Sequence, residues 1–221
     1  MESGKHEMLK RLAANIDKKL GLIIPYENSI KDLVNELSDT RDYMVINLGN
    51  AKTTIVIVRS WEILATNYFN IGIGELIDDI SKNYKITNIK AIKTIDTDGN
   101  YNKEKSDFYK IWEQALKITL ESTLWNSVCP HEVFVFWGGY NKFIEENIEN
   151  ISFHNTRIKM RKNISLLKID EKKKDFLHGK YQLDVKSNLS LISMIISTMK
   201  YFKWSENEMV HMLQKLLKKQ S

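Results

Sequence analysis

The sequence has few of the residues that staple a small domain or cross a membrane. Its one cysteine, Cys129, allows no internal disulfide, which is typical of a protein kept in a reducing compartment. No stretch reaches the roughly 18 uninterrupted apolar residues that a membrane-spanning helix needs. The first residues, including Lys5 and His6, lack the apolar run of a signal peptide. We therefore expect a cytoplasmic protein, with peripheral contact at the inner membrane face as an added alternative.

Histidine is sparse and scattered, which argues against a zinc site. The five histidines are His6, His131, His154, His178 and His211. No two of them have the spacing of metal ligands, so we predict no metal site. Cys129 is expected to end a helix before Pro130 and to be a small buried residue, because no motif marks a partner histidine for a catalytic thiol.

The composition is that of a folded domain with a mildly basic surface. Of 221 residues, 43% are hydrophobic and 28% are charged, enough for a stable core. The net charge of +5 comes from interspersed residues, with lysine runs late in the chain. A basic nucleic-acid-binding module is one reading of this charge. It is disfavoured because the aromatic residues fall at core spacings instead of forming a stacking surface.

Hydrophobic periodicity predicts an α/β chain with a mixed sheet flanked by helices. Helical spacing covers Met8–Leu20 and, with Ser29 as N-cap, the stretch to Leu37. Three strands joined by short turns then predict an antiparallel meander. These strands are Tyr43–Leu48, Thr53–Val58 and Glu62–Phe69.

Helices and one buried strand follow the meander. They are a helix from Gly72 through Lys82, a short helix at Thr87–Thr94, a long helix at Phe108–Trp125, a strand at Val133–Phe136 and a helix at Asn141–Ile148. Ile111, Trp112 and Ile118 are among the residues of the long helix expected to be buried. Short strands are expected at Ile158–Met160 and Leu166–Ile169, and helices at Leu189–Phe202 and Glu206–Lys219. We expect an N-terminal helical segment at 1–41, a lobe at 42–203 and a C-terminal amphipathic helix at 204–221.

Two glycine turns are candidates for contact with a nucleotide. The first is the turn between the first two strands, where Gly49 lets backbone N–H groups approach a phosphate and Thr53 adds a hydroxyl donor. The second is Gly138-Gly139-Tyr140, which ends a buried strand and opens a helix, and where Tyr140 could stack on a base. An ordinary hairpin and an ordinary strand-to-helix turn are the alternatives.

The order of these turns resembles the second lobe of the actin-like ATPases, and most of all that of the division protein FtsA and the pilus-assembly protein PilM. The match extends from about Tyr43 to Ile151. It is carried by Gly49 and Thr53 in the first turn, Ile71 and Gly72 before a helix that contains Asp79, Lys93 in the next helix, and Gly138 and Gly139 after the last strand. The resemblance implies a single actin-like, ribonuclease H-like lobe. It also implies tentative nucleotide-binding residues at Gly49, Asn50, Lys52, Thr53, Gly72, Lys93, Gly138, Gly139 and Tyr140.

Departures from the family pattern imply weak or lost nucleotide binding. The family aspartate that helps to place the metal is Asn47 here, and a neutral amide holds Mg²⁺ less firmly. Two family glycines are Asn50 and Ala51, a third is Ile73, and the nucleotide-facing glutamate is Lys90, although Lys52 could restore some positive charge. ATP with Mg²⁺ is therefore expected only as a weak ligand.

Chain length separates the two main hypotheses for function. In the family the nucleotide lies between two lobes, and only residues 1–42 precede the first strand here. We therefore expect an adaptor or scaffold that binds a protein partner in cell division or pilus assembly, not a free-standing ATPase. The alternative is one half of a split ATPase that a second chain completes.

The C-terminal helix offers an amphipathic surface. Its apolar face consists of Met209, Val210, Leu213, Leu216 and Leu217, and Lys218 adjoins this face. These six residues are the tentative contact with a membrane or a partner. The family resemblance implies a membrane-lying helix. Packing on another helix or on a protein partner is favoured instead, because Trp204 lies before the helix and not within it.

Overall fold

The computed structural model describes the lobe from residue 26 to residue 137 with short gaps, and scattered residues after it. The described residues are 26–95, 97, 99–124, 128–137, 151, 156–160, 165–166, 175, 193–194, 196–198 and 200. The helices are α2 (Tyr26–Leu37), α3 (Ile73–Tyr84), α4 (Asn88–Thr94), the 3₁₀ turn η1 (Gly99–Tyr101) and α5 (Asn102–Leu124). The strands are β1 (Tyr43–Leu48), β2 (Thr53–Arg59), β3 (Glu62–Phe69), β4 (Val128–Cys129), β5 (Glu132–Trp137), β6 (Lys159–Met160) and β7 (Ser165–Leu166).

The main sheet is mixed, in the order β3-β2-β1-β5-β7. The first three strands form the predicted antiparallel meander, with Tyr43 opposite Val58 and Thr53 opposite Phe69. β5 lies parallel to β1, with Tyr43 beside Glu132 and Leu48 beside Trp137. The α/β class and the mixed sheet with its meander are therefore confirmed.

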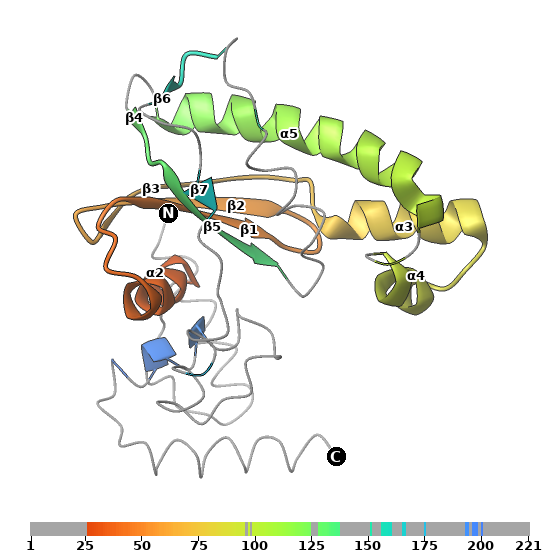
Figure 1. Cartoon of the computed structure of the whole chain (residues 1–221), viewed down its shortest axis with the longest axis horizontal. Coiled ribbons are helices and arrows are strands. Elements are labelled where there is room, and N and C mark those ends of the chain that lie inside the picture. Colours follow the sequence, from red (N-terminus) through yellow and green to blue (C-terminus); the bar gives the residue numbers. More distant parts are fainter. Residues whose placement is uncertain are drawn as a thin grey trace, which may run out of the picture.

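Helices cover both faces of the sheet (Figure 1). Side chains alternate along a strand, so Met44, Ile46 and Leu48 join the core under α3 and α5. Tyr43 and Val45 point to the opposite face and pack with α2. β2 is buried on both faces from Thr53 to Val58, which explains its continuous apolar and β-branched sequence.

The buried stripe of α5 differs from the one expected. The helix buries Phe108, Trp112, Leu116, Thr119, Leu120 and Leu124. Ile111 and Ile118 are instead 59% and 63% exposed, so the expectation of their burial was wrong. Ile111 and Ile118 directly precede the buried Trp112 and Thr119. Because successive residues of a helix are turned by about 100°, they point away from the buried face. Trp125 lies outside the described residues.

Other expected boundaries need smaller corrections. α2 begins at Tyr26, before the expected cap at Ser29, which is buried inside the helix. Cys129 ends the short strand β4 and not a helix. β6 covers two of the three residues expected at Ile158–Met160. β7 is described at Ser165–Leu166, and residues 167–169 of the expected strand lie outside the described residues. The predicted helices at 8–20, 141–148 and 206–219, with all six named residues of the C-terminal face, lie outside the described residues.

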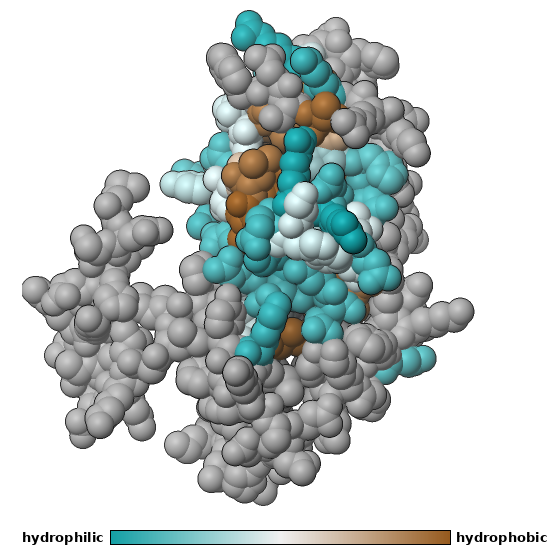
Figure 2. Space-filling model, turned by 90° about the vertical axis from the view of Figure 1, so that its left-hand side faces the viewer, coloured by the Kyte–Doolittle hydropathy of each residue, from teal (hydrophilic) through white to brown (hydrophobic). Residues whose placement is uncertain are grey.

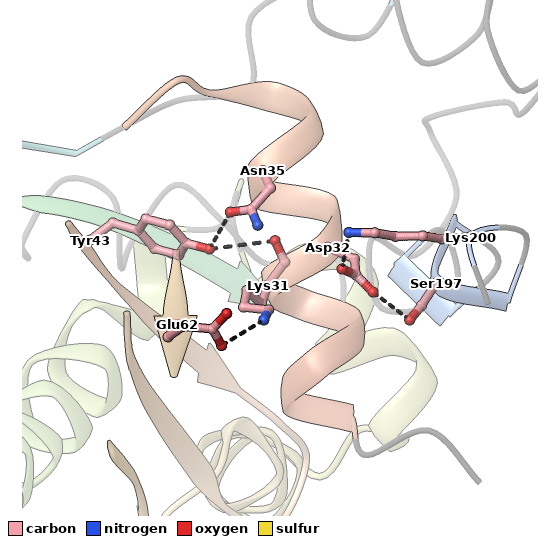
Figure 3. Close-up of polar contacts among 7 residues, drawn as sticks. All are labelled: Lys31, Asp32, Asn35, Tyr43, Glu62, Ser197 and Lys200. Carbon is pink, nitrogen blue, oxygen red and sulfur yellow. Dashed lines mark hydrogen bonds and ion pairs between the residues drawn. The ribbon is translucent and has the colours of Figure 1, made fainter. Parts of the chain in front are cut away.

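A polar network holds α2 to a later helical segment (Figure 3). The buried Asp32 carboxylate accepts hydrogen bonds from Ser197 Oγ at 2.7 Å and Lys200 Nζ at 2.8 Å. Tyr43 donates its hydroxyl to Asn35 Oδ1 at 2.8 Å, and burial, followed by the charge of Asp32, raises the pKa of this hydroxyl. α2, which the sequence places ahead of the lobe, thus shares the core of one sheet face.

On the face that Figure 2 shows, the described residues are mainly hydrophilic, with small apolar patches. Within the part of the chain that the structure describes, no helix combines the length and the apolar character needed to cross a bilayer.

Candidate functional site

The turn between β1 and β2 is the centre of the candidate site. It runs from Gly49 to Lys52, and Gly49 N–H donates to the carbonyl of Lys52 at 2.9 Å. Asn50, Ala51 and Lys52 are exposed, while Gly49 is half-buried. The turn therefore reaches solvent at the carboxyl end of β1.

The carbonyl groups of this turn cap the start of α3. Ile73 N–H donates to Gly49 O at 3.0 Å, and Gly74 N–H donates to Asn50 O at 2.8 Å. Glu75 N–H, the next donor, bonds to Gly72 O at 3.2 Å. The first N–H groups of a helix are the ones that usually bind an anion, and here the protein's own carbonyls occupy them.

Gly72 and Gly74 permit close contact between two backbone segments. A Cβ on Gly72 would lie 2.2 Å from Asn50 O and 2.4 Å from Asn50 C, and one on Gly74 would lie 2.7 Å from Asn50 O. Gly72 was expected to approach a nucleotide. It lies against Asn50, so the local reason for glycine at this position is the protein backbone.

Thr53 is fully buried, and its hydroxyl is engaged on both sides. It donates to Ile71 O at 2.7 Å and accepts from Trp112 Nε1 at 3.0 Å. A hydroxyl has one proton to donate, so Thr53 in this conformation has none left for a phosphate. The bonds instead join the turn to the segment before α3 and to the long helix α5.

The alternation of β2 places Thr54, not Thr53, beside Asn47. Asn47 and Thr54 are cross-strand partners, whereas Thr53 pairs with Leu48 and faces α5. Asn47 is half-buried and Thr54 is 5% exposed. Thr54 was not among the predicted site residues, although pairing Leu48 with Thr53 across the turn places Thr54 opposite Asn47.

The predicted cationic residues lie at the surface. The Lys52 ammonium lies 4.9 Å from the ring centroid of Tyr68, a cation–π contact at the end of β3. Lys93 is exposed in the last turn of α4, a helix that packs on α3 through the buried Ala91. Lys90, at the position of the family glutamate, is exposed as well.

The strand that precedes the second glycine turn ends beside β1. Leu48 and Trp137 are partners in the parallel pair β1–β5, so the two strands end at the same edge of the sheet. Gly138, Gly139 and Tyr140 follow directly, but they lie outside the described residues. Their contact with Gly49 across one crevice therefore stays a prediction.

Cys129 has the properties of a structural thiol. It is 2% exposed, and burial, opposed in part by the nearby Arg59, raises the pKa of its thiol to about 12. Among the described residues, no group of three histidine, cysteine, aspartate or glutamate side chains is placed to hold a metal.

This pKa predicts slow alkylation of Cys129 in the folded protein. The shift from 9.0 to about 12 lowers the thiolate fraction at neutral pH by about a thousand-fold. We expect iodoacetamide to label the native chain at least that much more slowly than the urea-unfolded chain. Comparable rates, followed by mass spectrometry, would contradict the burial of this thiol.

Comparison with solved structures identifies the fold. The chain superposes on the PilM–PilN type IV pilus biogenesis complex with a TM-score of 0.52 and 15% identity, covering 65% of this chain and 43% of that one. It superposes on Ta0583, an archaeal actin homolog, with a TM-score of 0.54 and 13% identity, covering 83% of this chain and 56% of that one. MreB5 of Spiroplasma citri, bound to AMPPNP, gives a TM-score of 0.48 and 15% identity over 71% of this chain and 58% of that one.

These similarities show the fold alone. On the two superpositions with TM-scores above 0.5, the chain has an actin-like fold, and it spans about half the length of those two structures. No protein-family model matches the sequence. The curated proteins also give no match.

Proposed function

We propose that the chain is an actin-like adaptor or scaffold, which binds a protein partner in cell division or pilus assembly and binds nucleotide weakly or not at all. The observation that carries the proposal is the capped start of α3. Its first N–H groups are bonded to Gly49 O, Asn50 O and Gly72 O, and the hydroxyl of Thr53 is bonded to Ile71 O. A phosphate at the start of α3 or at the Thr53 hydroxyl would have to break bonds that the protein already makes.

The residue at the metal position supports the same conclusion. Asn47 has no charge, so it can neither anchor Mg²⁺ as firmly as a carboxylate nor act as a base. We further propose that this binding protein acts in the cytoplasm, with the predicted C-terminal helix, 204–221, as a second contact for a partner or for the inner membrane face.

A protein partner is also supported by one of the similar structures. The PilM structure that this lobe resembles is a complex with PilN. We extend to this chain only the general property, an actin-like lobe that holds another protein.

The alternative function is one half of a split ATPase. The observation in its favour is that β1 and β5 are parallel neighbours. The two strands that precede the glycine turns therefore end at the same edge of the sheet. A second lobe from another chain would then complete the crevice and supply the missing phosphate loop.

Titration with MgATP distinguishes the two functions. We expect no binding tighter than about 1 mM by calorimetry, and no rise in melting temperature at that concentration. An Asn47→Asp variant serves as a matched control, since it restores the family charge while the donors at the start of α3 and at Thr53 stay engaged, and we expect it not to bind MgATP. Submillimolar, Mg²⁺-dependent binding by the unaltered chain would refute the adaptor proposal, and hydrolysis that needs a second protein would establish the alternative.

A further inference from the structure

A groove lies between α3 and α5, next to Ile71 and the first turn of α3. Its volume is about 220 Å³, and residues of both helices line it. Ile71 and Phe108 form apolar lining on its buried side, and Ile111, 59% exposed, lies toward solvent. The groove thus combines an apolar lining with an open side.

The walls of this groove are acidic on a chain that is basic overall. Glu75 and Asp79, one helical turn apart on α3, face Glu104 and Asp107 on α5, and Lys103 is the one cation in the lining. The whole chain has 33 basic and 28 acidic residues, so this local acid excess opposes the average. Four carboxylates around one hollow make a surface that attracts cations and repels phosphates.

The acidic residues differ in how far they are already engaged. Glu104 accepts from Asn83 Nδ2 at 3.0 Å, which bridges the two helices at this groove, and Asp107 lies 3.7 Å from Lys110 Nζ. Glu75 and Asp79 are exposed, and neither takes part in an ion pair found within the described part of the chain. These two carboxylates on α3 are therefore the ones open to an incoming positive charge.

The outer face of α5 continues the apolar surface beyond the groove. Ile118 is 63% exposed and follows Ile111 by seven residues, which places both side chains on one stripe two turns apart. Paired apolar anchors at this spacing beside a groove are the pattern by which one helix receives another. Single exposed apolar side chains are common on protein surfaces, whereas apolar side chains grouped on one face indicate a contact surface.

We propose that the groove between α3 and α5 docks a cationic amphipathic helix of a partner protein, an inference that rests on the adaptor function proposed above. The apolar face of that helix packs on Ile111 and Ile118, and its lysine or arginine side chains pair with Glu75 and Asp79. Charge complementarity selects this occupant, because the carboxylates disfavour nucleic acid and an anionic membrane. The proposed contact is made by side chains of the groove, whereas the neighbouring turn is held by backbone groups of Ile71 and Glu75.

A pair of synthetic peptides tests the docking site on the full chain. The probe is an amphipathic helical peptide of leucine and lysine, and its control replaces each lysine with glutamate. We expect the lysine peptide to bind in fluorescence anisotropy, more weakly at high salt, and the glutamate peptide not to bind. In the double variant Glu75→Lys, Asp79→Lys we expect affinity to fall by about ten-fold or more, as for the loss of central contacts.

Further variants separate docking from misfolding. Ile111→Ser removes an anchor without changing charge and should weaken the lysine peptide as well. Leu64→Ser, at a 55% exposed position on β3, and Asp39→Lys, at an exposed position after α2, alter polarity and charge elsewhere and should leave binding unchanged. Circular dichroism confirms that each variant is folded.

Four outcomes would overturn the docking site. Equal binding by the groove variants, or equal binding of both peptides, would overturn the docking site. Self-association of the full chain that the groove variants abolish would assign the groove to a second copy and would also overturn it. No binding of the lysine peptide would overturn the docking site, and if MgATP does not bind either, the adaptor function still stands. Groove binding together with tight MgATP binding would refute the adaptor function alone.

Discussion

Replacing Trp112 with alanine is expected to lower the free energy of unfolding by about 4 kcal/mol, the usual cost of deleting a large aromatic side chain from a core. Trp112 is fully buried on α5. Its ring lies 6.5 Å from that of Phe69 and 6.2 Å from that of Tyr109, and its indole N–H donates to Thr53 Oγ1 at 3.0 Å. The substitution removes packing and the hydrogen bond together. Urea unfolding followed by circular dichroism measures the change.

Two variants on the same helix calibrate this prediction. Ile118→Ala changes an isoleucine that is 63% exposed, and we expect it to alter the free energy of unfolding by no more than about 0.5 kcal/mol. Trp112→Phe keeps an aromatic ring but loses the donor to Thr53, and it should fall between the two. A cost for Trp112→Ala as small as that for Ile118→Ala would show that α5 does not pack on the sheet as described.

Gly72→Ala is expected to cost about 3 kcal/mol, at the upper end of the range for overpacked sites. The added Cβ would lie 2.2 Å from Asn50 O and 2.7 Å from Ala51 C, which are backbone atoms that cannot rotate away. The turn and the start of α3 would have to separate. This movement would break the bonds from Ile73 N–H to Gly49 O and from Gly74 N–H to Asn50 O. Thermal and urea unfolding of the variant report the loss.

Gly99→Ala is the matched control for this substitution. A Cβ on Gly99 would meet its nearest atom, Asn102 Nδ2, at 4.0 Å, so the same chemical change fits without strain. We expect Gly99→Ala to leave stability unchanged within about 0.5 kcal/mol. If both glycines tolerated alanine equally, the close contact between the two backbone segments would be refuted.

Trp112 and Gly72, whose substitutions have the two largest expected effects, both hold the β1–β2 turn in place. Thr53 links the β1–β2 turn to α5 through Trp112, and the glycine at 72 lets the turn cap α3. Thr53 and the first N–H groups of α3 form hydrogen bonds that hold the turn to the rest of the lobe.

The sequence predicts the types of the elements better than their faces. The short β-branched runs from Tyr43 to Phe69 predict three strands, and the structure confirms them as a meander. For α5, the period predicts the helix but assigns Ile111 and Ile118 to the wrong face. The reason is that apolar residues occur on two sides of this helix, and only contact with the sheet decides which side is buried.

The candidate site shows a similar division. Gly49, Thr53 and Gly72 can be singled out from the motif order, and the structure brings these three together. Their partners, Asn50 O for Gly72 and Trp112 for Thr53, could not be predicted from the motifs. The contact between Thr53 and Trp112 joins residues 59 positions apart, and no local pattern encodes such a pairing.

The sequence by itself determined an α/β chain, its meander, its single cysteine and the neutral Asn47, because these follow from residue identity and local periodicity. Only the tertiary structure decided that β5 pairs with β1, that the turn caps α3, and that α3 and α5 enclose an acidic groove. Each of these depends on segments far apart in the chain, whose contacts are set by burying apolar surface and satisfying backbone hydrogen bonds together.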